Sequence, residues 1–136
     1  MGKAIGIDFG LKRTGISISD ELGIIATPLT AVASQGLMDF LIDIVKKESI
    51  EVLVLGYPLG LNGKDTDITP NVRLFKKALE NQFPMLTIAF FDERMTSKIA
   101  QQTLIQITSK KKRRVKGSID QLSATIILQD YLNSKC

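Results

Sequence analysis

Hydrophobic positions alternate with polar or small ones along the first third of the chain and predict three short strands. The first is expected over Lys3–Asp8, where isoleucines fall on one face, and the second over Thr14–Ser19. A third is expected over Ile24–Val32, at a sheet edge or with a bulge, because Pro28 cannot donate to a strand ladder. The short links between the three indicate an antiparallel meander.

The middle of the chain alternates helical and strand patterns. A helix is expected from a Ser34 cap to about Glu48, and a second helix over about 71–82. Glu51–Gly56 and Met85–Phe91 are continuous apolar runs, typical of strands in the interior of a sheet. The apolar face expected for the first of these helices consists of Leu37, Phe40, Leu41, Ile44 and Val45.

Two more helices are expected towards the end of the chain. One covers about 96–107, opened by a threonine or a serine, and Gly117 marks a break after it. Ser118 and Gln121 have the spacing of a capping box for a last helix that runs to about Leu132. The whole pattern predicts one α/β domain over residues 1–136, with a mixed five-stranded sheet flanked by helices.

The positive charge of the chain is concentrated in one segment. There are 18 Lys and Arg against 14 Asp and Glu, a formal net charge of +4, and 12 basic residues would remain without this segment. Such a run is either a solvated loop or a contact to an anionic polymer. The six basic residues of the segment are Lys110, Lys111, Lys112, Arg113, Arg114 and Lys116.

Composition excludes several kinds of chemistry. The chain has no histidine and a single cysteine, Cys136, so zinc sites and nucleophiles paired with histidine are excluded. One terminal cysteine cannot form an internal disulfide, which favours a reducing, cytoplasmic compartment. No apolar run is long enough for a membrane helix, and no leader precedes the first strand.

Acidic residues end two of the predicted strands. Asp8 ends the first strand between Gly6 and Gly10. It shares one strand face with Ala4 and Gly6, whose side chains are small or absent, so a phosphate, a metal or another part of the protein could approach the backbone there. Asp92 and Glu93 end the last strand. Ligands of open α/β sheets gather at the carboxyl ends of the strands, so we expect a site there. Alternation along the strand does not decide between Asp92 and Glu93.

A third carboxylate comes from the last helix. Asp120 lies at helical spacing before an apolar stripe, so it heads the face that packs inward. Two carboxylates about 5 Å apart repel by roughly 3 kcal/mol at an effective dielectric constant of about 20. A cluster therefore needs a proton or a cation, and oxygen ligands suit Mg²⁺ or Mn²⁺. The stripe consists of Ala124, Ile127, Leu128 and Tyr131.

The stretches "IGIDFGLKRTGISISD", "LGIIATPL", "VLGYPLGLNG", "FDERMTS" and "SIDQLSATIILQDYL" together resemble the YqgF/RuvX family of RNase H-like nucleases over nearly the entire chain. The resemblance implies an RNase H-like fold and a metal-binding catalytic trio of Asp8, Glu93 and Asp120. It implies processing of the 5′ end of pre-16S rRNA, and similarity to Holliday junction resolvases. Tyr57 stands where leucine is usual in the family, which bears on substrate contact.

Four functions follow from these observations. The first is a divalent-metal-dependent nuclease on structured nucleic acid, with an rRNA precursor favoured and branched DNA as the alternative. The others are a Holliday junction resolvase, an RNA-binding assembly factor without catalysis, and an ATP-binding protein, because the first strand and its turn resemble a phosphate motif. The oligomeric state is monomer or dimer. Besides the basic segment, the residues expected to contact nucleic acid are Lys12, Arg13 and Arg94.

Overall fold

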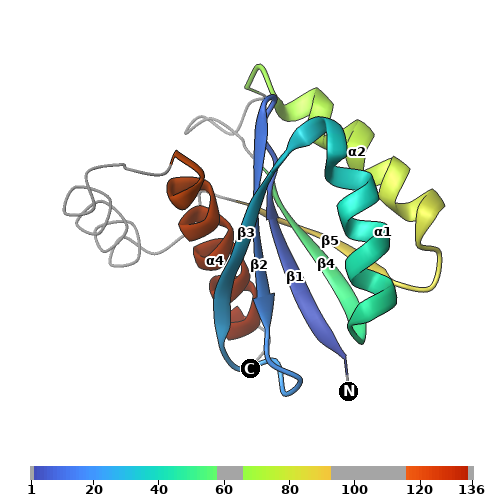
Figure 1. Cartoon of the computed structure of the whole chain (residues 1–136), viewed down its shortest axis with the longest axis vertical. Helices are drawn as coiled ribbons and strands as arrows, with labels where there is room; N and C mark the ends of the chain where they lie inside the picture. The colour runs from blue at the N-terminus through green and yellow to red at the C-terminus, as the bar shows by residue number, and fades with distance from the viewer. Residues whose placement is uncertain (1, 58–65, 93–115, 135–136) are drawn as a thin grey trace.

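Helices cover both faces of one five-stranded sheet (Figure 1). The helices are η1 (Ser34–Gly36, a 3₁₀ turn), α1 (Leu37–Lys47), α2 (Thr69–Gln82) and α4 (Lys116–Ser134). Helices α1 and α2 lie on one face of the sheet and α4 lies on the other. The computed structural model describes residues 2–57, 66–92 and 116–134, with side chains in α4 from Gln121 onward.

The sheet contains β1 (Lys3–Asp8), β2 (Arg13–Ser19), β3 (Ala26–Ala33), β4 (Ile50–Tyr57) and β5 (Thr87–Asp92). Its strand order is β3-β2-β1-β4-β5, which places β1 in the centre. β2 pairs antiparallel with both β1 and β3, whereas β4 pairs parallel with both β1 and β5. The predicted meander and the mixed sheet are both confirmed.

The predicted edge position of Pro28 is confirmed, whereas the predicted interior position of the last strand is wrong. Pro28 lies on the edge strand β3, and the β2–β3 register shifts between Ile16 and Ser17, opposite it. The last strand was expected in the sheet interior from Met85 onward. Instead β5 is the other edge of the described sheet, and Met85 precedes it with 95% of its surface exposed. An edge strand is covered less completely than a central one. The apolar run over Met85–Phe91 therefore did not show whether this strand lies at the edge or in the interior of the sheet.

The third strand begins two residues later than predicted. Ile24 and Ile25 belong to the β2–β3 turn, where both backbone N–H groups donate to Asp20 Oδ1, at 2.7 and 3.0 Å. This capture of two N–H groups by one carboxylate is a turn motif typical of aspartate. It also lowers the pKa of Asp20, because the bonds from Ile25 and Ile24 favour the ionised carboxylate.

Ser34 does not cap α1, which corrects the prediction. η1 occupies Ser34–Gly36, and α1 begins at Leu37 without a side-chain cap bond. The Ser34 hydroxyl instead donates to the Gly10 carbonyl, 24 residues earlier in the chain. The apolar face predicted for this helix is confirmed, since Leu37 and Leu41 are fully buried and the other three members pack against them.

α4 begins at Lys116, so the prediction of a break at Gly117 and a cap at Ser118 is wrong. Both residues lie inside the helix. The apolar stripe predicted for it is confirmed, because Ala124, Ile127, Leu128 and Tyr131 are all buried. The helix predicted over about 96–107 lies outside the described residues. None of the helices in the described part of the chain is long and apolar enough to cross a membrane.

Two separate cores hold the layers together. The larger lies between the sheet and α1 and α2, and the smaller lies between the sheet and α4. Alternation along β1 divides its side chains between them: Ile5 and Ile7 enter the larger core, and Ala4 enters the smaller one. The face of each strand residue near the site can therefore be read from the core its neighbours join.

Candidate active site

The parallel strands bring two of the predicted acidic positions to one edge of the sheet. Asp8 is the last residue of β1, and Asp92 is the last residue of β5, paired with Tyr57 of β4. β4 separates the two strands, so their axes lie about 10 Å apart. Side chains that extend from these two ends can approach one another only if they emerge on the same face.

Alternation separates Asp8 from Asp92. In β5, Ile88 and Phe90 pack against the core of α1 and α2, whereas Ala89 and Phe91 pack against the core of α4. Position 92 therefore falls on the face that α2 covers. Asp8 shares its face with Ala4 and so lies on the α4 side. Glu93 lies outside the described residues.

The bare face of β1 is occupied by α4. A Cβ atom added at Gly6 would lie 2.7 Å from Leu128 Cβ and 2.8 Å from the Ala124 carbonyl oxygen. Gly6 is therefore required by close helix packing, and it admits another part of the protein in place of a phosphate or a metal. At Gly10, an added Cβ would collide with the Arg13 carbonyl oxygen, so this glycine is required by the tight turn after Asp8. Neither glycine is direct evidence of a ligand.

The packing of α4 on the sheet fixes the direction in which the helix runs. Gln129 receives a hydrogen bond from the Ala26 N–H and donates one to the Ile24 carbonyl, beside the beginning of β1. Ala124 lies further along, where its carbonyl accepts a 2.8 Å bond from Ser17, the residue paired with Gly6. The helix therefore runs antiparallel to β1, and its first turn points towards the end of β1 that carries Asp8.

Asp120 lies in the N-terminal part of α4, one helical turn before Ala124. Four residues of helix rise about 6 Å, and the two strand residues from Gly6 to Asp8 span about 6.6 Å. The backbones of Asp8 and Asp120 therefore lie at similar distances, and in the same direction, from the contact between Gly6 and Ala124. The Asp120 side chain lies outside the described ones.

Of the predicted trio, only Asp8 has a described side chain. Among the described residues no three acidic or thiol groups lie close enough to hold a metal ion, as expected when two members of the trio are not included. The oxygen donors that the sequence brings to this edge suit a hard divalent cation. Lys12 and Arg13 are exposed at the turn that follows Asp8. Lys116 starts α4, and Arg94 and the segment 110–114 lie outside the described residues.

Sequence reasoning missed one feature of this edge, a pair of hydroxyl groups under the β1–β2 turn. Thr14 is fully buried, and its hydroxyl lies 2.8 Å from that of Ser34. A threonine among the isoleucines of a buried strand is a signal that could have identified it, because a buried hydroxyl requires a partner. Ser34 was interpreted as a helix cap, which concealed its role.

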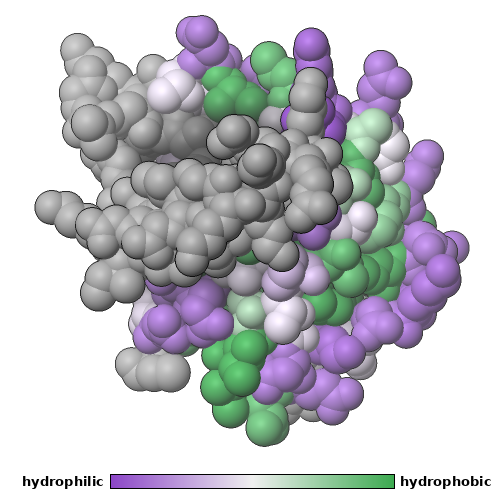
Figure 2. Space-filling view, turned by 60° about the vertical axis from the view of Figure 1, so that its left-hand side comes forward, coloured by the Kyte–Doolittle hydropathy of each residue, from purple (hydrophilic) through white to green (hydrophobic). Residues whose placement is uncertain are grey.

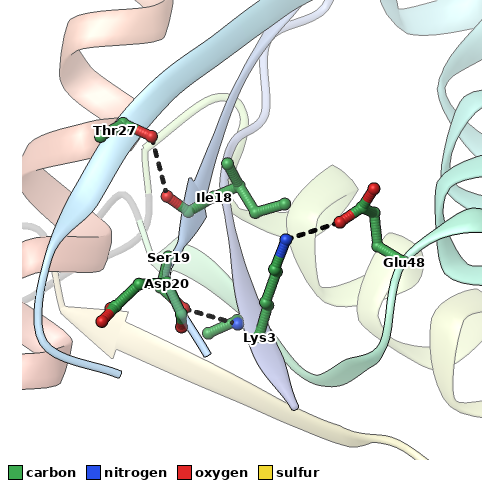
Figure 3. A network of polar contacts seen from close by, with 7 residues as sticks. Lys3, Ile18, Ser19, Asp20, Thr27 and Glu48 are labelled. Atoms are coloured by element: carbon green, nitrogen blue, oxygen red, sulfur yellow. Dashed lines mark hydrogen bonds and ion pairs between the residues drawn. The ribbon is translucent and has the colours of Figure 1, made fainter. Parts of the chain in front are cut away.

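The opposite end of the sheet has a different character. Lys3 and Glu48 form a 2.7 Å ion pair at the beginning of β1 (Figure 3), and the hydrogen bond from Lys3 to Glu48 raises the Lys3 pKa. The β2–β3 turn exposes Leu22, Ile24 and Ile25, each by more than half. Figure 2 shows apolar surface at the lower end of the molecule, where this turn lies in Figure 1.

Comparison with known proteins gives consistent results. A protein of Amoebophilus asiaticus is 47% identical over 135 residues, with 98% of this chain and 96% of that protein covered. One of Flavobacterium johnsoniae is 44% identical over 136 residues, with 99% of both covered. Both carry the name "Putative pre-16S rRNA nuclease".

The fold resembles that of a solved RuvC structure. The structure described as "T. thermophilus RuvC in complex with Holliday junction substrate" matches with a TM-score of 0.62 at 10% identity, covering 99% of this chain and 96% of that chain. The likeness establishes an RNase H-like fold, as the sequence predicted. A family model described as "RuvX: Holliday junction resolvase" matches residues 2–134. The chain therefore belongs to the RuvX family.

Proposed function

We propose that this protein is a divalent-metal-dependent nuclease that acts on structured nucleic acid and processes the 5′ end of pre-16S rRNA. The name carried by relatives at 44–47% identity over nearly the whole chain supports both the reaction and the substrate. An rRNA precursor is a cytoplasmic substrate in a bacterium, so we propose that compartment as well.

The observation that carries the proposal is the register of α4 on β1. The Ala124 carbonyl lies over Gly6, and the helix runs towards the end of β1. We propose that Asp8 and Asp120 meet there and that Glu93 completes the set. A glutamate suits the third position, because β5 lies about 10 Å from β1 and a glutamate side chain is one methylene longer than that of aspartate.

The proposed trio fits a magnesium or manganese ion by the chemistry of its donors. All three are carboxylates, and the chain contains no histidine and a single cysteine, Cys136. When bound, such an ion activates a water molecule and stabilises the charge that develops during in-line displacement at phosphorus. Cleavage without histidine is therefore chemically consistent with this sequence.

The protein's own residues would hold the substrate. Lys12 and Arg13 are exposed beside Asp8, and we propose that they contact phosphates next to the scissile bond. The basic segment Lys110–Lys116 leads directly into α4 in the sequence, and we propose that it contacts further phosphates of the same substrate. Phosphate contacts of this kind position a nucleic acid and make its affinity dependent on salt.

Holliday junction cleavage is the second candidate, favoured by the description of the family model and by the fold shared with RuvC. Purified protein with Mn²⁺ should be given a 5′-extended 16S rRNA precursor and a four-way DNA junction in parallel. We expect faster cleavage of the precursor. Cleavage of the junction alone would favour the second candidate, and binding of RNA without cleavage of either substrate would favour an assembly factor.

A further inference from the structure

The turn that follows Asp8 is closed by a chain of hydrogen bonds through two hydroxyl groups. The Ser34 hydroxyl has a single proton and donates it to the Gly10 carbonyl. The Thr14 hydroxyl, 2.8 Å away, must then donate to Ser34 Oγ, and Thr14 Oγ1 accepts from the Gly10 N–H at 3.5 Å. The chain thus starts and ends on Gly10, with every donor oriented in the same sense.

The backbone of Ser34 holds the same turn at a second point. Its N–H donates to the Lys12 carbonyl at 2.9 Å, so Ser34 forms hydrogen bonds to both Gly10 and Lys12. This arrangement comes from the junction of β3 and η1, a part of the chain more than twenty residues away. A turn with Gly10 at its centre would be easily deformed by itself. The bonds to Ser34 and Thr14 give it one conformation.

We propose that Thr14 and Ser34 are positioning residues that hold the β1–β2 turn so that Lys12 faces a substrate phosphate beside this turn. The inference rests on the proposed function and adds to it two residues that make no contact with substrate. Lysine has a long and flexible side chain, so the position of its ammonium group depends on a fixed backbone. A displacement of about 1 Å at a reacting centre can cost on the order of a hundredfold in rate.

A double-mutant cycle separates positioning from general stability. The Kd of a fluorescently labelled precursor stem would be measured in EDTA for wild type, Lys12→Gln, Ser34→Ala and the double variant, with unfolding temperatures alongside. We expect Lys12→Gln to raise Kd at least about threefold more in the wild-type background than in the Ser34→Ala background. Ser34→Thr keeps the hydroxyl and should restore the wild-type response. Thr14→Val repeats the test if Ser34→Ala does not fold.

Ser19 supplies a matched control. Its buried hydroxyl accepts a 2.8 Å bond from the Ala4 N–H at the opposite end of the sheet (Figure 3). Ser19→Ala should lower stability comparably and show no coupling to Lys12. An equal effect of Lys12→Gln in the wild-type and Ser34→Ala backgrounds would overturn the proposal, as would the absence of any effect of Lys12→Gln. Binding is measured without a divalent ion, so the outcome of the mutant cycle does not depend on cleavage. A failure of cleavage would refute the proposed function alone.

Discussion

The Ser17 hydroxyl donates a 2.8 Å hydrogen bond to the backbone carbonyl of Ala124, and this bond joins the middle of the sheet directly to α4. Ser17 is fully buried and pairs with Gly6 across β1 and β2. The absence of a side chain at Gly6 allows the helix to come close enough for the bond. Together these residues set how far along β1 the N-terminal part of α4 lies, and hence where the backbone of Asp120 lies relative to Asp8.

Gly6→Ala should therefore damage both stability and the proposed site. The new methyl group would collide with Leu128 and with the Ala124 carbonyl, and relief requires α4 to move away from the sheet. We expect a loss of about 1–3 kcal/mol in the free energy of unfolding, together with reduced nuclease activity. Denaturant unfolding and cleavage rate would measure the two effects.

Gly36 provides the control for that substitution. Nothing lies within 4 Å of a Cβ placed there, and its φ of −99° is accessible to alanine. Gly36→Ala should change stability by less than about 0.5 kcal/mol and leave cleavage unchanged. Equal effects of the two substitutions would mean that close packing at Gly6 does not set the position of α4.

Substitutions at Asp92 and Glu93 should differ sharply. Asp92 falls on the face that α2 covers, away from the face of Asp8, and the resemblance to the family assigns the ligand to Glu93. We expect Glu93→Gln to lower the cleavage rate by at least about a hundredfold, as for loss of a metal ligand, and Asp92→Asn to retain most of it. Single-turnover cleavage with Mn²⁺ measures both. The reverse order of effects would assign the ligand to Asp92.

The basic segment should govern how affinity depends on salt. Replacement of the basic residues of Lys110–Lys116 by glutamine should flatten the plot of log affinity against log salt, by about 0.9 for each lost contact to duplex phosphate. Lys46 and Lys47 serve as a control, because they end α1 at the end of the sheet opposite to Asp8. Their replacement should leave the slope unchanged. A slope that persists without the segment would remove it from the interface.

The Asp20 carboxylate should make the β2–β3 turn sensitive to acid. Its pKa is lowered by the N–H groups of Ile25 and Ile24, so its contribution to stability is present above the unfolded value of 3.8 and is lost as pH falls through the folded value. Asp20→Ala should lower the unfolding temperature at neutral pH, by an amount that shrinks in acid. Asp20→Asn keeps an acceptor oxygen, so thermal scans should show a smaller loss at pH 7 and less variation between pH 5 and 3.

Particular residues show how far the sequence could predict this structure. The period-two pattern and Pro28 were sufficient for the meander and its edge, because alternation and the missing N–H are local properties. The contact of Gly6 with α4 and the use of Ser34 beneath the first turn were not predictable, because each depends on a partner far away in the chain. The face on which Asp92 lies likewise could be read only from the cores that its neighbours in β5 join.

The most direct test of the catalytic assignment is Mn²⁺-dependent cleavage of the rRNA precursor by wild type and by Asp8→Asn, prepared identically and matched in circular dichroism and unfolding temperature. The substitution keeps the size of the side chain and removes the charge that a divalent ion requires. We predict that cleavage by Asp8→Asn falls to background while RNA binding in EDTA is preserved. Cleavage at the wild-type rate by a folded Asp8→Asn protein would contradict the account.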